Sequence, residues 1–571
     1  MKRRQFLLSG TVPLLGSIGT WQPESAHRET QQKQQSSDIY KRLVRANDAA
    51  IAKLLARQER REGHAGLGGI PDAQGIYSAG AAAGFIKTLS AAFCAPESSY
   101  FNSEQLVRRM EPTARFLLSV QYQDGNIDLY TTNFHSPPDT AFVVEPLAVA
   151  MSELRRSKVE GLEGIKAGLD KFLRAAGRAL TVGGIHTPNH RWVVCSALAR
   201  LNSLYPTPGY VSRIDDWLGE GIDIDDDGQF AERSTSIYSP TCDNGLLTVA
   251  RLLNRPQLMD PVRRNLAMTL YYMHADGEVA TEGSRRQDQY LRGSMAGYHI
   301  PYRFFALEER NGKFAAVARM IEEKHGDELS GNLIYFLENP QLRRELPSVE
   351  SLPDNFVRSF SRSDLVRIRR GIVSATILGA NPTFFSFHKG AAALQAVRMA
   401  AAFFGKGQFQ GVRIEQEGGR WSLKQSLTAP YYQPLPAEAR RPDGDWAKMD
   451  KNHRLQSEVQ SLESTVVIRE ENGRFELQID LGGCDNVPVV VELGFRRGGR
   501  LAGVVPVADM EDIHILEKGM GSYTYDGQTI EFGQGGADHR YTQLRGALPR
   551  FDAMTVYLTG FTPFRRQLII K

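Results

Sequence analysis

The sequence predicts an α+β protein in which a toroid of helical hairpins, residues 39–345, precedes an antiparallel β-sheet sandwich, residues 346–571. Apolar residues recur at helical spacing from about Ile39 to Asn339, as in residues 142–154. From about Val366 onward, short alternating or β-branched runs replace this pattern, and turn dipeptides separate them. A glycine turn that recurs in the helical half favours hairpins arranged in a ring.

The first 26 residues predict an export signal. A basic start, Lys2 to Arg4, precedes an apolar stretch from Phe6 to Gly19, and small residues follow it. The start resembles the twin-arginine type, which exports folded proteins. The apolar stretch is too short for a membrane span, which needs ~20 apolar residues. With residues 27–38 as a polar linker, we expect a periplasmic or secreted protein with no stable membrane span after signal removal.

The overall charge is nearly balanced. Lys and Arg number 69 and Asp and Glu 65, which gives a formal net charge of +4 over 571 residues. Nucleic-acid binding usually requires a concentrated basic stripe, so we expect no nucleic-acid partner. The four cysteines (Cys94, Cys195, Cys242 and Cys484) are widely spaced, which favours buried free thiols, although export permits one bridge.

A short turn recurs four times in the helical half, each time after a helical run. The turns are Asp124-Gly125, Gly183-Gly184, Asp227-Gly228 and Asp276-Gly277, and their second residues lie 59, 44 and 49 residues apart. That period is about the length of one helical hairpin, and repeated hairpins stack or close into a ring. A solenoid is the alternative, but a toroid better suits a single site.

A polar loop follows each of these turns. If the hairpins form a ring, equivalent loops lie at the same end and their side chains converge on one concave site, where ligands usually bind. The loops contribute, in order, Asn133, His135 and Asp139; His186, Asn189, His190 and Arg191; Glu232, Arg233 and Tyr238; and Glu282, Arg285, Arg286, Asp288 and Tyr290.

The β half contains two clear hairpin signals and one helical signal. Residues 466–479 turn at Asn472-Gly473, and residues 523–532 turn at Asp526-Gly527; both dipeptides tolerate the positive φ of tight turns. Ala391–Phe404 predicts one inserted helix. His388 lies just before it, where either a substrate contact or an interdomain contact is expected.

At the residue level the chain resembles polysaccharide lyases of the heparinase II/III, chondroitin AC and alginate lyase type. The resemblance lies in an Asn and a His from one hairpin, here Asn189 and His190, and a Tyr from the next, here Tyr238. The stretches "GHAGLGGIPDAQGIYSAGAA" and "FAERSTSIY" resemble the subgroup that acts on rhamnosyl-glucuronate ends. The resemblance implies an incomplete α/α toroid followed by antiparallel β-sheets.

Such lyases cleave a uronic-acid glycoside by β-elimination, and the resemblance therefore implies roles for these residues. Asn189 and Arg233 would stabilise the substrate carboxylate as enolate charge develops. His190 would be the base or a neutraliser, with His135 in reserve, and Tyr238 would be the acid and also a candidate base. The substrate-binding set would be Asn133, Arg191, Glu232, Arg285, Tyr290 and His388.

Other interpretations remain open for these residues. Asn189 could cap its helix, and Tyr238 could be a packing residue. A glycoside hydrolase would need two carboxylates, which Asp139, Glu232 and Asp288 could supply. A noncatalytic glycan-binding protein is the third alternative, and it predicts exposed aromatic residues in the cleft and no turnover.

The sequence "DIDDDG", Asp223 to Gly228, matches the start of a calcium loop. Its twelfth position is Ser234, where an EF-hand requires a bidentate Glu, which argues against an EF-hand. A structural calcium ion is compatible with the clustered carboxylates. No zinc-site spacing or P-loop is found, so we expect that catalysis requires no metal or cofactor.

Overall fold

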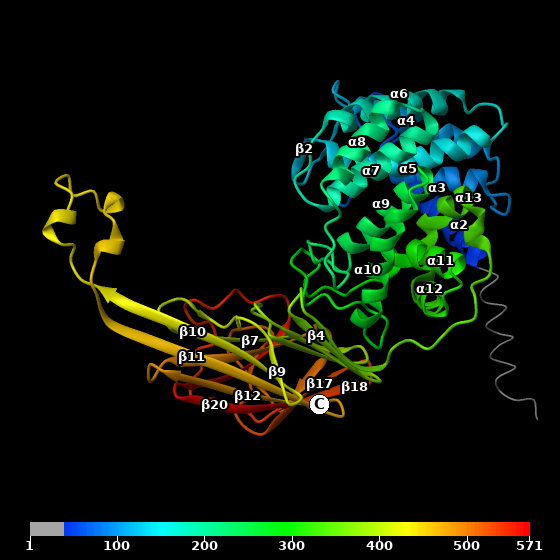
Figure 1. The fold of residues 1–571 in the computed structure, drawn as a ribbon. Helices are drawn as coiled ribbons and strands as arrows, with labels where there is room; N and C mark the ends of the chain where they lie inside the picture. The colour runs from blue at the N-terminus through cyan, green and yellow to red at the C-terminus, as the bar shows by residue number, and fades with distance from the viewer. Residues whose placement is uncertain (1–38) are drawn as a thin grey trace, which may run out of the picture.

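The computed structural model describes residues 39–571, and it shows a helical part joined to a part built from β-sheets (Figure 1). The predicted export signal and linker lie outside the described residues. The helices are α2 (Ile39–Arg57), α3 (Ala79–Cys94), α4 (Glu104–Ser119), α5 (Pro137–Arg156), α6 (Glu163–Val182), α7 (Asn189–Leu204), α8 (Pro208–Gly219), α9 (Tyr238–Leu252), α10 (Met259–Tyr272), α11 (His299–Glu308), α12 (Gly312–His325) and α13 (Leu333–Glu338).

Alternate helices pack side by side to form the inner layer of the toroid. Helix α5 packs against α3 and α7, and α7 packs against α9. Helix α7 is buried at every position from Asn189 to Leu201, whereas α4 and α6 bury only part of their residues. The chain returns to the inner layer through a loop before α3, α5, α7, α9 and α11, so the N-termini of these helices gather at one end of the toroid.

The recurring turn is real, but one of its four predicted members is wrong. Gly125, Gly228 and Gly277 adopt positive φ angles of 93°, 91° and 81°. Gly183 instead ends helix α6 with φ −70°, because its N–H donates to the carbonyl of Ala179. The missing member is Gly75, with φ 81°, which closes the same kind of turn before α3. The five loops are therefore equivalent in position, but the loop before α7 lacks the glycine turn.

The close approach at Gly125 gives a test of this turn. A Cβ atom there would lie 2.2 Å from the carbonyl oxygen of Ala175, at a φ angle that disfavours any side chain. We expect Gly125→Ala to lower the free energy of unfolding by about 3 kcal/mol, measured by chemical denaturation. Gly184→Ala is the matched control, since its Cβ would meet no atom within 4 Å. Equal losses of stability in Gly125→Ala and Gly184→Ala would contradict the requirement for glycine at the Gly125 turn.

Two antiparallel sheets form the C-terminal part. The larger sheet has the order β15-β16-β19-β13-β7-β6-β5-β4-β3, with β8 paired to β7, and its one parallel pair is β16 with β19; the smaller has the order β14-β17-β18-β20-β12-β11-β10-β9. The strands are β3 (Asn355–Phe360), β4 (Leu365–Arg370), β5 (Val373–Leu378), β6 (Phe385–Lys389), β7 (Ala392–Ala401), β8 (Gly407–Gln408), β9 (Glu415–Glu417), β10 (Arg420–Tyr432), β11 (Gln456–Glu471), β12 (Arg474–Gly483), β13 (Pro488–Phe495), β14 (Arg500–Ala502), β15 (Val505–Pro506), β16 (Ile513–Ile515), β17 (Met520–Tyr525), β18 (Gln528–Gly533), β19 (Met554–Phe561) and β20 (Phe564–Ile570).

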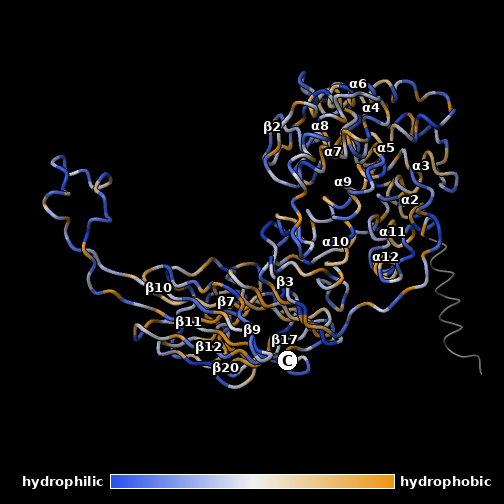
Figure 2. Tube along the Cα trace, in the orientation of Figure 1, coloured by the Kyte–Doolittle hydropathy of each residue, from blue (hydrophilic) through white to orange (hydrophobic). Residues whose placement is uncertain are grey.

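One apolar core joins the two sheets into a sandwich. Leu394 and Leu493 of the larger sheet share it with Leu477 and Ile530 of the smaller one. Both predicted hairpins are confirmed, as β11 with β12 and β17 with β18. Strands β10 and β11 extend beyond the sandwich as a long arm, whose tip is mostly hydrophilic (Figures 1 and 2).

The helix predicted over Ala391–Phe404 is wrong, because this segment is strand β7. Its alanines favour a helix in isolation. Strand β7 lies between β6 and β13, however, and all ten of its residues are buried. Small side chains suit a strand that is covered on both faces, so tertiary packing overrides the helical preference.

The four cysteines are free; Cys195 and Cys242 are buried, and Cys94 and Cys484 are partly exposed. The last helical turn of the toroid ends at Arg343, and the first strand of the sandwich begins at Asn355. Within residues 39–571, no helix is both long enough and apolar enough to span a membrane.

Candidate active site

Five side chains from three successive loops meet at the end of the toroid where the inner helices begin. We call this group the loop-end cluster: Asn189, His190, Glu232, Tyr238 and Arg286. Asn189 and Tyr238 are the first residues of α7 and α9. The positive ends of these helix dipoles therefore point toward the cluster, which favours an anionic ligand.

Asn189 and Glu232 form the buried base of the cluster. The Asn189 side-chain amide donates to Glu232 Oε2 at 2.5 Å, and its backbone N–H donates to the same oxygen at 2.9 Å. The Asn189 side chain does not cap α7, so that interpretation is wrong. The carboxylate of Glu232, from the next loop, supplies the acceptor at the start of this helix.

Arg286 connects Glu232 to Tyr238. Its Nε lies 3.6 Å from Glu232 Oε1, and its guanidinium lies 5.2 Å from the centre of the Tyr238 ring. The Tyr238 hydroxyl accepts a hydrogen bond from the side-chain amide of Gln287, which leaves its own O–H free to donate. Tyr238 is half-buried, so its hydroxyl is held in place yet accessible.

His190 is the cluster's best-placed base. Its ring lies edge-on to those of His186 and Phe142, at 4.7 and 6.3 Å between centres. Burial, with His186 beside it, lowers the pKa of His190 to about 4. Its Nδ1 is buried without a partner in the described part of the chain. At neutral pH the imidazole is therefore uncharged and able to accept a proton.

The first loop reaches the cluster through Asp139 rather than through His135. Asp139 lies close enough to His190 to oppose the lowering of its pKa, and it accepts hydrogen bonds from Asn133 and Ser136. His135 is instead stacked on Tyr122 and bonded to Asp124, with more than half of its side chain exposed. Asn133 therefore lies beside the cluster, whereas His135 is occupied elsewhere.

Four further predicted site residues, besides His135, lie outside the cluster. Arg191 is ion-paired with Asp223 at 2.9 Å. Arg233 donates to the carbonyls of Arg362 and Ser363 in the sandwich, and Arg285 lines the same small cavity as Arg233. Tyr290 is stacked on Phe551 and hydrogen-bonded to Thr383. Arg191, Arg233 and Tyr290 hold hairpins and domains together, and the binding roles of all four residues remain predictions.

Arg286, which contacts Glu232 and Tyr238, was outside the predicted catalytic and binding set, in which Arg285 stood instead. The two arginines are adjacent in a loop, and no helical or strand periodicity indicates which one faces the cluster. The only sequence signal for an arginine at the cluster is the adjacent pair Arg285-Arg286. Arg286 faces Glu232 and Tyr238, whereas Arg285 lines the cavity beside Arg233. Tertiary packing decides this difference.

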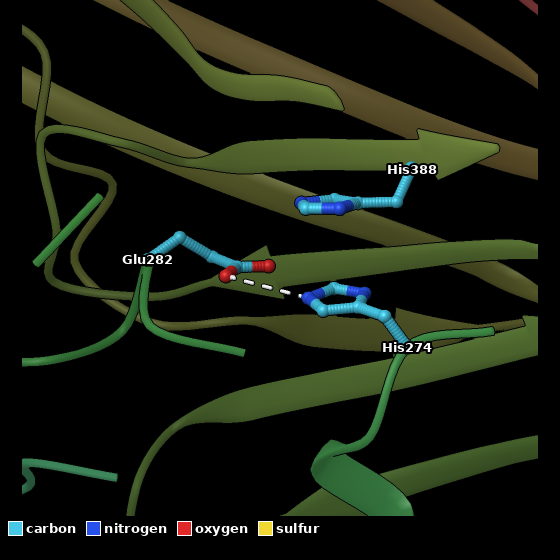
Figure 3. A group of neighbouring side chains, drawn as sticks. All are labelled: His274, Glu282 and His388. Atoms are coloured by element: carbon cyan, nitrogen blue, oxygen red, sulfur yellow. Dashed lines mark ion pairs between the residues drawn. The ribbon is translucent and has the colours of Figure 1, made fainter. Parts of the chain in front are cut away.

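His388 is buried at the junction of toroid and sandwich, together with His274 and Glu282 (Figure 3). The His274 and His388 rings are stacked 3.7 Å apart at 13°, and Glu282 Oε2 lies 3.9 Å from His274 Nε2. Burial lowers the pKa of His388 to about 4, so both rings pack without charge repulsion at neutral pH. With 4% of its surface exposed, His388 makes the expected interdomain contact, and its role in substrate binding stays a prediction.

Among residues 39–571, His274, Glu282 and His388 form the one group with the spacing of metal ligands. An imidazole nitrogen binds a metal through a lone pair in the ring plane, and nearly parallel rings do not aim their lone pairs at one point. Glu282 already accepts hydrogen bonds from Thr376 and Ser386. The observed geometry is therefore that of a packed contact.

The carboxylates of the predicted calcium loop are bound by donors on different sides. Asp223 accepts from Arg191 and Trp192, and Asp225 accepts from the backbone N–H groups of Asp227 and Gln229. Asp226 is paired with Arg362. These contacts compensate the carboxylate charges without an ion, and a calcium site here remains an untested prediction.

Comparison with solved structures identifies the fold. Heparinase III matches with a TM-score of 0.52 at 10% identity, covering 85% of this chain and 75% of that one. Chondroitin AC lyase from Streptomyces coelicolor A3, in complex with chondroitin sulphate, matches with a TM-score of 0.53 at 13% identity, covering 95% and 82%. Xanthan lyase from Paenibacillus matches with a TM-score of 0.55 at 9% identity, covering 96% and 60%.

The chain therefore has the fold of polysaccharide lyases built from an α/α toroid and antiparallel β-sheets. The predicted fold class is confirmed. No protein-family model matches the sequence, and no curated protein sequence matches it. At these identities the likeness establishes architecture, and the chemistry has to be argued from the loop-end cluster.

Proposed function

We propose that the protein is a polysaccharide lyase that cleaves a uronic-acid glycoside by β-elimination at the loop-end cluster. The observation that carries this proposal is the meeting of a neutral His190, a hydroxyl-donating Tyr238 and the cation of Arg286 at converging helix N-termini. These groups supply a base, an acid and a charge for a carboxylate. The fold shared with heparinase III and chondroitin AC lyase supports it.

The reaction removes the C5 proton of the uronate and breaks the C4–O4 bond. His190 accepts the C5 proton, while Arg286 neutralises the substrate carboxylate as enolate charge develops. The enolate electrons form the C4–C5 double bond, and the Tyr238 hydroxyl protonates the departing O4. Proton return from His190 to Tyr238 through water restores the enzyme. No oxidant, reductant or water molecule is consumed.

In this scheme Asn189 acts through Glu232 rather than on the substrate. Both of its side-chain N–H groups are used, one by Glu232 and one by Thr187. Arg233, whose guanidinium is bonded to the sandwich, gives way to Arg286 as the carboxylate ligand.

The low pKa of His190 predicts where activity is lost in acid. Above pH 4 the ring is mostly neutral and can take the C5 proton; as the pH falls through about 4 the ring is protonated and this capacity is lost. We expect the acid limb of kcat/KM to lie near 4 rather than near 6.5, and His190→Gln to abolish most of the activity. His135→Gln is the control and should keep it. An acid limb near 6.5, or equal losses in both variants, would reject His190 as the base.

The rhamnosyl-glucuronate type of substrate and export to the periplasm or medium are parts of the same proposal. They are supported by the resemblance of the "FAERSTSIY" segment and by the basic-apolar pattern of residues 1–26. A screen of uronic-acid glycans for an ultraviolet-absorbing 4,5-unsaturated product tests the activity and its substrate together. Absence of this chromophore with every glycan that the protein binds would count against the lyase.

A further inference from the structure

A cavity of about 470 Å³ lies between the helices of the toroid. Its walls are single faces of the inner helices, because the lining residues are spaced three or four apart: Val193, Ser196 and Arg200 on α7, and Thr241, Asn244, Thr248 and Arg251 on α9. Arg200 is seven positions after Val193, so the cavity extends roughly 10 Å along the helix axis. This volume is in the range of small-molecule sites.

One end of the cavity adjoins the loop-end cluster. Phe142, whose ring lies 6.3 Å from that of His190, lines it, and so does Ile237, the residue before Tyr238. The other end contains charged groups that the proposed elimination does not use. These are Lys87, Arg200, Arg251 and Glu145, with the Tyr335 hydroxyl beside them.

Two of these cations form no ion pair within 4 Å in residues 39–571. Arg200 is bonded to Glu145 at 2.7 Å and Glu338 at 2.5 Å, and Tyr335 also donates to Glu145. Lys87 and Arg251, in contrast, form no ion pair or hydrogen bond in the described chain. Lys87 lies 6.0 Å from the Tyr335 ring, and Arg251 lies 5.9 Å from the Phe304 ring.

An unpaired cation that is partly removed from water raises the free energy of the folded protein, and buried charges are therefore normally paired. Lys87 and Arg251 are partly buried in the cavity wall, and this burial lowers the pKa of both. An anion in the cavity would supply these cations with a partner. The nearby carboxylates, Glu145 beside Lys87 and Glu338 beside Arg251, act on these cations only at longer range, because each forms its ion pair with Arg200.

We propose that the toroid cavity is a second binding site for an acidic monosaccharide unit, whose carboxylate is attracted by Lys87 and Arg251 in the cavity wall. The side-chain oxygens of Asn244 and Asn332, whose NH2 groups are already bonded, and the hydroxyl of Ser196 offer partners for sugar hydroxyls. Val193 and Phe142 can pack against the ring. The acidic unit can be the end of a glycan chain or a free sugar acid. The site does not depend on the proposed elimination, because it uses none of the loop-end cluster.

Calorimetric titration of the full chain carrying Tyr238→Phe tests this site without turnover. D-glucuronate is the probe, and D-glucose, which has the same ring without the carboxylate, is its neutral match. We expect saturable binding of glucuronate that weakens with salt, and much weaker binding of glucose. Adding Lys87→Met or Arg251→Met should weaken glucuronate binding at least about tenfold. Lys171→Met, which removes an exposed cation on α6, should leave it unchanged.

Thermal unfolding separates a binding role from a structural one. Without ligand, Lys87→Met and Arg251→Met should unfold no lower than the parent, since each removes an unpaired cation. With glucuronate, the parent should gain a higher Tm that both variants lack. Three results would overturn the proposal: equal affinity for glucose and glucuronate, undiminished glucuronate binding after both Lys87→Met and Arg251→Met are introduced together, or no saturable binding.

Inhibition of the active enzyme by glucuronate then shows whether the cavity binds the end of a glycan chain or a free sugar acid. If the chain end occupies the cavity, glucuronate competes with a glycan substrate; if a free acid does, glucuronate binds without competition. Either outcome keeps the carboxylate site. Failure of the elimination chemistry would instead appear as absent turnover with calorimetric binding intact, so the two proposals fail in different ways.

Discussion

Tyr238→Phe is expected to lower kcat for glycan cleavage by roughly 10²–10⁴-fold, because it removes the hydroxyl that protonates O4. The ring itself should remain in place beside Arg286, since the cation–π contact does not involve the hydroxyl. Glycan binding should therefore change little. Initial rates of chromophore formation and calorimetric binding of the same glycan measure the two effects.

The matched control is Tyr431→Phe, which removes the hydroxyl of an exposed tyrosine in the arm, 58% accessible. It should leave both rate and binding unaltered. Unchanged turnover in Tyr238→Phe would show that another group protonates O4. Loss of binding together with activity would place Tyr238 in substrate recognition instead.

Arg286→Gln is expected to lower kcat/KM by about 10²–10³-fold, because it removes the cation assigned to the developing enolate charge. The adjacent Arg285→Gln provides a control of the same residue type in the same loop. Arg285 lines a cavity with Arg233, and its charge contributes to lowering the pKa of Arg233. Its removal should relieve repulsion and leave catalysis nearly intact.

The pair of variants also tests the orientation of this loop. If Arg285→Gln is the inactive variant and Arg286→Gln the active one, the assignment of carboxylate binding is reversed. Circular dichroism and thermal unfolding of both variants should match those of the parent, because Arg286 is about one third exposed and contacts Glu232 only at 3.6 Å. A folding defect confined to Arg286→Gln would point to a structural role for the Glu232 contact.

The order of the two halves could be predicted from hydrophobic periodicity alone. The helical spacing before residue 339 and the alternating runs after residue 366 are strong local signals, and the turns at Asn472-Gly473 and Asp526-Gly527 define their hairpins. The segment Ala391–Phe404 could not be predicted this way. It forms a strand because it pairs with β6 and β13 on either side. A local sequence pattern does not contain these tertiary pairings.

The sequence could predict which loops form the candidate site, because equivalent loops lie at the same end of the toroid. It could not predict the directions of their side chains. Recurrent loops placed the ends of α7 and α9 together, and thus Asn189, Glu232 and Tyr238 in one region. Which way each side chain points is decided by its partners. Arg191 and Arg233 are drawn to Asp223 and to sandwich carbonyls, and Tyr290 to Phe551, and none of these contacts leaves a signal in the spacing of residues.

The most direct test of the proposed elimination is mass analysis of the product formed in ¹⁸O-labelled water from a uronic-acid glycan. Elimination forms a product that absorbs in the ultraviolet, is lighter by one water than the hydrolysis product, and carries no ¹⁸O at the cleaved bond. We expect this result from the parent protein and its loss in Tyr238→Phe. A non-absorbing product that incorporates ¹⁸O would contradict the account and indicate a hydrolase acting through carboxylates such as Glu232 and Asp139.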